Sequence, residues 1–140
     1  MKRVFGVLLI TLFAFSCGGD SYDREAEKGK VIDVHDEVMP KLGEVMNLRK
    51  QVLAKATELS TDDSESDTVE SLRDLAAELD AARKGMMTWM NDWSKSSKPH
   101  VGGTSTVEEQ KAYFIAEMER VTKVKDNINN SIAAANKVLK

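Results

Sequence analysis

The sequence has little of what several fold classes and function classes require. It contains one cysteine, Cys17, so no disulfide can form within the chain. It contains only two prolines, and few glycines fall inside its periodic segments, whereas an all-β fold needs frequent turn residues. Aromatic residues make up 6% of the chain and charged residues 31%, a composition typical of long amphipathic helices. These scarcities predict an all-α protein.

The chain also lacks an excess of basic residues. Its formal net charge is −3, and removing Lys2 and Arg3 from the 20 basic residues leaves 18 against 23 acidic ones, a net charge of −5. A nucleic-acid-binding domain carries a basic stripe, and a membrane-surface helix of the polybasic kind carries clustered lysines. We therefore expect no nucleic-acid partner.

The amino terminus has the pattern of a signal peptide. Lys2 and Arg3 precede an apolar run over residues 4–16, which is too short to cross a bilayer as a helix. The segment Ala14-Phe15-Ser16-Cys17-Gly18-Gly19 then resembles a bacterial lipobox, in which the cysteine is acylated and the chain is cut before it. Phe15 is bulkier than the usual residue at its position, so the match is to a looser form of the motif. The alternative is an ordinary secretory signal followed by an incidental cysteine.

We predict that residues 1–16 are a cleaved signal peptide and that Cys17 is lipidated. Lipidation removes a lone thiol that is otherwise a liability in an exported protein. Residues 17–28 continue as a polar, unpatterned stretch, which we expect to be a flexible tether. The predicted location is the bacterial cell envelope, on the periplasmic side or the outer-membrane surface, with the membrane contacted through the amino-terminal lipid.

Apolar residues recur at alternating steps of three and four in three later segments, which is the spacing of amphipathic helices. The predicted helices cover residues 29–59, 67–95 and 106–139 approximately. Pro40 lies inside the first helix and predicts a kink there. The polar stretches 60–66 and 94–105 predict the connections between the helices.

Two sequence motifs support these boundaries. Asp67 with Glu70, and Thr106 with Glu109, match the capping box at a helix start. Short connections make consecutive helices antiparallel neighbours. The predicted fold is therefore an all-α, antiparallel, up-down-up three-helix bundle of long helices over residues 29–140, after the lipoprotein signal peptide. The alternative is an elongated coiled-coil hairpin that dimerises.

The segment from Met86 to Trp93 holds three of the six methionines after Met1 and both tryptophans. If the first turn centres near residue 63 and the second near residue 100, the antiparallel register brings His35 to this segment. The predicted cluster lies at the end nearer the anchor, with His100 in its loop. Its members are His35, Met39, Met86, Met87, Trp89, Met90, Trp93, Tyr113 and Phe114.

This cluster has two interpretations. Methionine fills irregular core space and its sulfur packs against aromatic edges, so the simpler one is a packed core containing a neutral imidazole with one satisfied nitrogen. The sharper one is a soft-metal site, because thioether and imidazole ligands select Cu(I) or Ag(I). His35 and Met39 are four residues apart, as are Met86 and Met90, so the two members of each pair share a helix face. The candidate metal ligands are His35, Met39, Met86, Met87 and Met90, and the cofactor of this alternative is copper.

Other metal and catalytic motifs are missing. Ile32 stands three residues before His35, so the E-x-x-H pattern of di-iron bundles is absent, as are H-E-x-x-H and C-x-x-C-H. A haem held by methionine and histidine stays formally open. Consecutive helical residues point about 100° apart, so we expect the carboxylates of Asp36 and Glu37 to turn away from the imidazole. We assign no catalytic residue and no small-molecule substrate, and expect a protein that is not an enzyme.

The motifs HDEVMPK at residues 35–41, MMTWM at residues 86–90 and VTKVKDNI at residues 121–128 carry a resemblance. They resemble small uncharacterised lipoproteins of Bacteroidetes-type bacteria, sometimes labelled "viral A-type inclusion protein", over most of the mature chain. The resemblance implies an envelope location and a looser lipobox, but no activity, no residue roles and no viral role. The expected function is structural or protein-binding in the cell envelope, with an unidentified envelope protein as the candidate partner, and soft-metal binding is the alternative.

Overall fold

The computed structural model describes residues 22–140, so the predicted signal peptide, Cys17 and the first residues of the predicted tether lie outside the described residues. The described part is almost entirely helical and contains no strand. The prediction of an all-α protein is confirmed for this part of the chain. None of the helices in it is both long and apolar enough to cross a membrane.

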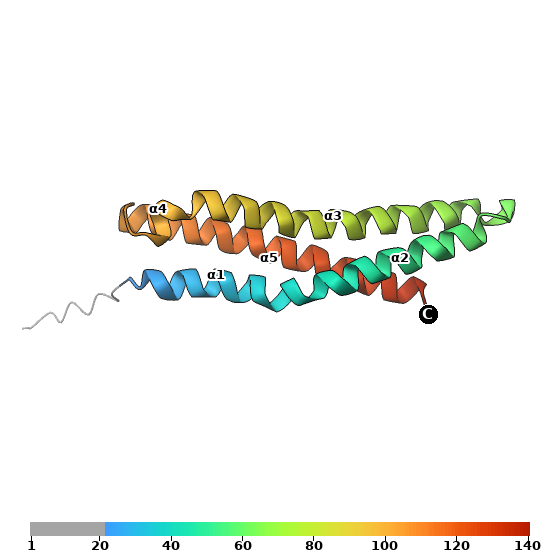
Figure 1. The fold of residues 1–140 in the computed structure, drawn as a ribbon, viewed down its shortest axis with the longest axis horizontal. Coiled ribbons are helices and arrows are strands. Elements are labelled where there is room, and N and C mark those ends of the chain that lie inside the picture. The colour runs from blue at the N-terminus through green and yellow to red at the C-terminus, as the bar shows by residue number, and fades with distance from the viewer. Residues whose placement is uncertain (1–21) are drawn as a thin grey trace, which may run out of the picture.

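Within the described part, the chain forms five α-helices and two short 3₁₀ turns. Their bounds are α1 Arg24–Val38, η1 Met39–Lys41, α2 Leu42–Leu59, η2 Asp63–Glu65, α3 Ser66–Ser96, α4 Lys98–Val101 and α5 Val107–Val138. Figure 1 shows that α1 and α2 follow one another as a bent rod, that α3 runs back alongside, and that α5 runs in the direction of α1 again. The first predicted helix is thus divided in two, and the second connection contains the one-turn helix α4.

The first helix begins earlier than predicted. The Asp23 side chain caps it by accepting a hydrogen bond from the Ala26 N–H at 3.1 Å. Glu25 and Glu27 lie in the first turn, where negative charge complements the helix dipole. Residues 24–28 are therefore helical, and the prediction that the tether extends to residue 28 is wrong. The segment gave no helical signal because it carries no apolar stripe, only a cap.

At Pro40, where a kink within one helix was predicted, the 3₁₀ turn η1 divides the helix into α1 and α2. Proline has no N–H to donate to the carbonyl four residues earlier, so the α-helical bonding must be interrupted. The Met39 N–H still donates to the His35 carbonyl, and the Leu42 N–H then donates to the Met39 carbonyl. This tighter bonding carries the chain through the break, and α2 continues at a bend (Figure 1).

One of the two predicted capping boxes is present. The Thr106 side chain accepts a hydrogen bond from the Glu109 N–H at 3.3 Å, and the Glu109 carboxylate accepts one from the Thr106 N–H at 2.8 Å. The box predicted at Asp67 is wrong, because α3 begins one residue earlier and Asp67 lies within its first turn. Asp62 acts as the cap of η2 instead, accepting from the Ser64 N–H at 2.9 Å.

A single apolar core runs along the rods. α2 packs on α3, α1 packs on α5, and α3 and α5 pack along each other. α1 and α3 meet mainly through side chains, such as the rings of His35 and Trp89. The largest fully buried side chains are Leu79, Met86, Ile128, Val31, Val38, Val45, Val52 and Val121. Within each rod these residues lie seven apart, which is two turns of the three-and-four periodicity that predicted the helices.

Acid should weaken the start of α5 through Glu109. Hydrogen bonds from the Thr106 backbone and side chain hold the pKa of Glu109 below its usual value near 4.5. A carboxyl whose pKa is lowered on folding adds stability above its unfolded-state pKa, and that stability is lost as the pH falls through the folded-state pKa. Glu109→Gln should therefore melt below the parent at about pH 7, and the difference should close between about pH 5 and pH 3.

Glu108→Gln is the matched control, because Glu108 lies in the same first turn and makes no such hydrogen bond in the described structure. Thermal unfolding of the parent and both variants across this pH range measures the effect. Identical pH curves for the two variants would contradict the role of the capping box.

Candidate functional site

A series of ring contacts joins α1, α3, α4 and α5 at one end of the molecule. The His35 ring centroid lies 5.6 Å from that of Trp89, and Trp89 stacks on Trp93 at 5.4 Å. Trp93 contacts Tyr113 at 5.8 Å, and Tyr113 stacks on His100 at 4.1 Å. The structure therefore brings both histidines and both tryptophans together, where the antiparallel register placed them.

The register between α3 and α5 nevertheless differs from the expectation of a turn centred near residue 100. The Trp89 Nε1–H donates to Glu117 Oε2 at 2.9 Å, and Ser96 Oγ is hydrogen-bonded to the Tyr113 hydroxyl at 2.8 Å. These pairs place the centre of the turn near Gly103. The shift arises because α3 extends to residue 96 and α4 adds a helical turn within the connection.

A buried carboxylate in this cluster was missed by the sequence reasoning. Glu117 is only 4% exposed, and besides Trp89 it accepts a hydrogen bond from Arg120 Nη1 at 2.7 Å. Arg120 Nη2 donates to Asp92 Oδ2 at 2.7 Å, and the two carboxylates raise the pKa of the guanidinium. The available signal was a glutamate on the apolar stripe of a helix, three residues after Phe114, with an arginine three residues further on.

The imidazole of His35 is held by its neighbour in the chain. Its Nδ1 lies 2.7 Å from Asp36 Oδ1. An ionised carboxylate can only accept, so Nδ1 carries a hydrogen, and in the neutral imidazole Nε2 then carries a lone pair. The expectation that Asp36 turns away from the imidazole is wrong, because the two side-chain rotamers close the 100° step. Glu37 does turn away, and pairs with Lys125 of α5 at 3.1 Å.

The Nε2 atom of His35 is one of five buried side-chain nitrogen and oxygen atoms among the described residues that lack a hydrogen-bond partner. Buried polar atoms in folded proteins almost always have a partner, so this one requires an explanation. The available signal was a histidine in an apolar stripe, which the simpler interpretation of the cluster took as a core imidazole with one satisfied nitrogen.

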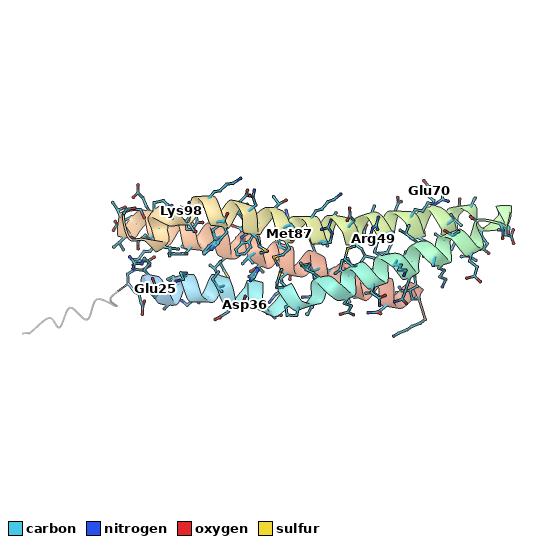
Figure 2. All side chains as sticks on the ribbon, in the orientation of Figure 1. Glu25, Asp36, Arg49, Glu70, Met87 and Lys98 are labelled. Carbon is cyan, nitrogen blue, oxygen red and sulfur yellow. The ribbon has the colours of Figure 1, made fainter. Side chains whose placement is uncertain are left out.

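The candidate metal-ligating methionines separate according to helix face. Met86 is fully buried, and Met39 and Met90 are partly buried against the core. Met87, labelled in Figure 2, is 47% exposed, because its neighbour Met86 takes the inward position about 100° away. Met87 therefore does not share the interior with the other predicted ligands.

Comparisons with protein-family models, with curated proteins and with solved structures give no match for this chain. Within residues 22–140, no group of three or more His, Cys, Asp or Glu side chains is placed to hold a metal ion. Cys17, the predicted lipidation site, lies outside the described residues.

Trp89→Phe should destabilise the fold by about 1–3 kcal/mol, because it leaves the buried Glu117 carboxylate with one donor fewer. Equilibrium urea unfolding at neutral pH measures this loss. Trp93→Phe is the matched control, since it shortens an indole in the same stack without removing a hydrogen bond to a buried carboxylate, and it should cost less. A larger loss for Trp93→Phe than for Trp89→Phe would contradict the importance of the bond.

Proposed function

We propose that the protein is a cell-envelope lipoprotein, anchored through Cys17, with a non-enzymatic structural or protein-binding role. In this proposal residues 24–139 form one closed, antiparallel, up-down-up three-helix bundle that stands at the membrane. The basic start, the apolar run and the lipobox-like segment of residues 2–19 support the anchor. A continuous apolar core shared by α1, α2, α3 and α5 supports the closed bundle.

The start of α1 determines how the bundle stands. Tyr22 already packs against the core, two residues before the helix begins. The five residues from 18 to 22 span at most about 18 Å when fully extended. The end of the bundle at which α1 begins and α4 lies (Figure 1) is therefore the end that faces the membrane in this proposal.

The observation that carries a binding role is an exposed apolar surface at this same end. Ile115 is 70% exposed and Val107 is 42% exposed. They lie eight residues apart with Lys111 between them, so the three share one face of α5. The Lys111 Nζ lies 5.4 Å from the centre of the Tyr22 ring, and Tyr22 lines surface hollows with both Ile115 and Val107.

We call Tyr22, Val107, Lys111 and Ile115 the anchor-proximal patch. Single exposed apolar residues are ordinary, whereas a contiguous apolar patch rimmed by charge is typical of a protein contact. Its position beside the predicted anchor points to a partner that also lies in the envelope. For these reasons the patch favours a protein-binding role over an enzymatic one.

Cys17→Ala should abolish acylation of the protein in cells. Acyl chains attach the chain stably because each buried methylene contributes about 0.8 kcal/mol. Incorporation of a fatty-acid analogue, followed by isolation of the protein, measures acylation directly and does not depend on whether the signal peptide is cut. Ser16→Ala, which keeps a small residue before the cleavage position, should still be labelled. Undiminished labelling of Cys17→Ala would remove the anchor from the proposal.

A photo-crosslinking amino acid at position 115 should yield a discrete adduct with an envelope protein in intact cells. The same amino acid at position 130, an exposed site on the distant half of α5, should yield none. Ile115→Asp should reduce the adduct formed from position 111, while changing the unfolding free energy by no more than about 0.5 kcal/mol. Equal adducts at positions 115 and 130, or none at either, would contradict a contact through the patch.

A further inference from the structure

In its neutral form, the imidazole of His35 presents the Nε2 lone pair to the interior. Its side chain is 17% exposed, Asp36 holds Nδ1 at 2.7 Å, and Nε2 is buried without a hydrogen-bond partner among the described residues. Metal-binding histidines commonly donate their other N–H to a carboxylate in this way, which fixes the tautomer and makes the ligating nitrogen more basic. His35 is therefore oriented like a metal-binding histidine whose Nε2 is available as the ligating atom.

Contacts with α5 show which way α1 faces. Glu37 pairs with Lys125 at 3.1 Å, so that flank of α1 lies toward α5. His35 and Met39 are four residues apart and share a different flank. Since the His35 ring contacts that of Trp89, this flank lies toward α3. Both donors of the first rod thus point into the space between α1 and α3.

The donors of α3 are placed by the same reasoning. Asp92 binds Arg120 at 2.7 Å, which marks the flank of α3 that lies toward α5. Met86 and Met90 lie on the other side of Trp89, about 60° and 100° around the helix from it. Because Asp92 marks the flank toward α5 and the Trp89 ring contacts His35 of α1, we infer that this side lies toward α1.

The levels along the rods agree as well. α1 and α3 run in opposite directions (Figure 1), and His35 lies against Trp89. Met39, one turn further along α1, is then level with Met86, one turn back along α3. Met90 is level with His35. The four donors lie within about 6 Å of one another along the bundle axis, which is one helical turn.

We propose that these four side chains form a site for a soft monovalent cation, Cu(I) or Ag(I). Thioether sulfur and imidazole nitrogen are uncharged donors that favour soft ions, whereas hard ions such as Ca²⁺ and Mg²⁺ require oxygen ligands. The indole face of Trp89 borders the site and adds a cation–π attraction for a single positive charge. The proposal goes beyond the envelope role, since it depends neither on the anchor nor on the anchor-proximal patch.

The test uses the full-length chain in detergent, with Cys17→Ala to remove its only thiol, which would itself bind soft ions. Titration with Ag(I), and with Cu(I) kept reduced against a chromophoric competitor, should show one ion per chain bound with a Kd below about 1 µM. Tryptophan fluorescence should change with the same saturation point, because Trp89 borders the proposed site and Trp93 stacks on Trp89.

Four variants of this protein locate the site. His35→Phe keeps a ring beside Trp89 and removes both nitrogens, while Met39→Leu and Met90→Leu keep the side-chain volume and remove the sulfur. Each should weaken binding by about tenfold or more, with the helix content and melting temperature little changed. Met87→Leu is the matched control, because Met87 is on the same helix but 47% exposed, and it should bind like the parent.

The proposal is overturned if no binding tighter than about 10 µM is found, or if His35→Phe binds as the parent does. Equal losses in Met87→Leu and Met90→Leu would also overturn it, since they would place the sulfur contact at the surface. If circular dichroism shows that His35→Phe is unfolded, the two single methionine variants decide the matter: unchanged affinity in both would leave only core packing. Acylation of Cys17 and crosslinking at position 115 are measured separately, so they can fail or succeed independently.

Discussion

The buried indole of Trp89 is the constraint from which the rest of this end of the bundle follows. A buried indole N–H needs an acceptor, and Glu117 of α5 supplies it at 2.9 Å. A carboxylate that is 4% exposed needs a cation in turn, and Arg120 supplies that charge while remaining in contact with water. The extension of Arg120 to Asp92 returns the network to α3. One side chain thereby fixes the register of α3 against α5, and with it the positions of Trp93 and Tyr113.

The bend at η1 explains why such large side chains gather at this end and not along the whole molecule. α2 lies directly on α3, and the buried residues there include Ala56, Ala76 and Ala82. Beyond the bend, α1 packs on α5 and reaches α3 through side chains. The wider separation must be filled, since cavities are costly, and rings and methionines fill it. Pro40 therefore determines the path of the backbone and also which side chains are needed to fill the core beside it.

The features of this structure that depend on periodicity could be predicted from the sequence. Those that depend on side-chain rotamers and on short helical turns could not. The three-and-four spacing predicted the helical class, and the antiparallel register placed His35 near Trp89, because an error of a few residues in a turn shifts the level by only one helical turn. The start of α1 was not predicted because its first turn carries no apolar stripe. The α3–α5 register shifted because α4 added a turn of helix that no apolar pattern announces. The roles of Glu117 and Asp36 were not predicted because each depends on the position of its partner, Trp89 or His35.

The conformation of His35 connects this architecture with the proposed cation site. Asp36 fixes one nitrogen of the ring, and the neighbouring indole fixes its plane, so Nε2 cannot turn toward water without breaking both contacts. The packing of the core around that nitrogen offsets the cost of leaving it without a hydrogen bond. This cost is already part of the free energy of the folded chain. A ligand that binds there meets a donor that is oriented in advance and loses little conformational entropy on binding. In the proposed cation site, flexible thioethers from η1 and α3 would adjust to the ion, which is the property that distinguishes methionine from leucine at the same positions.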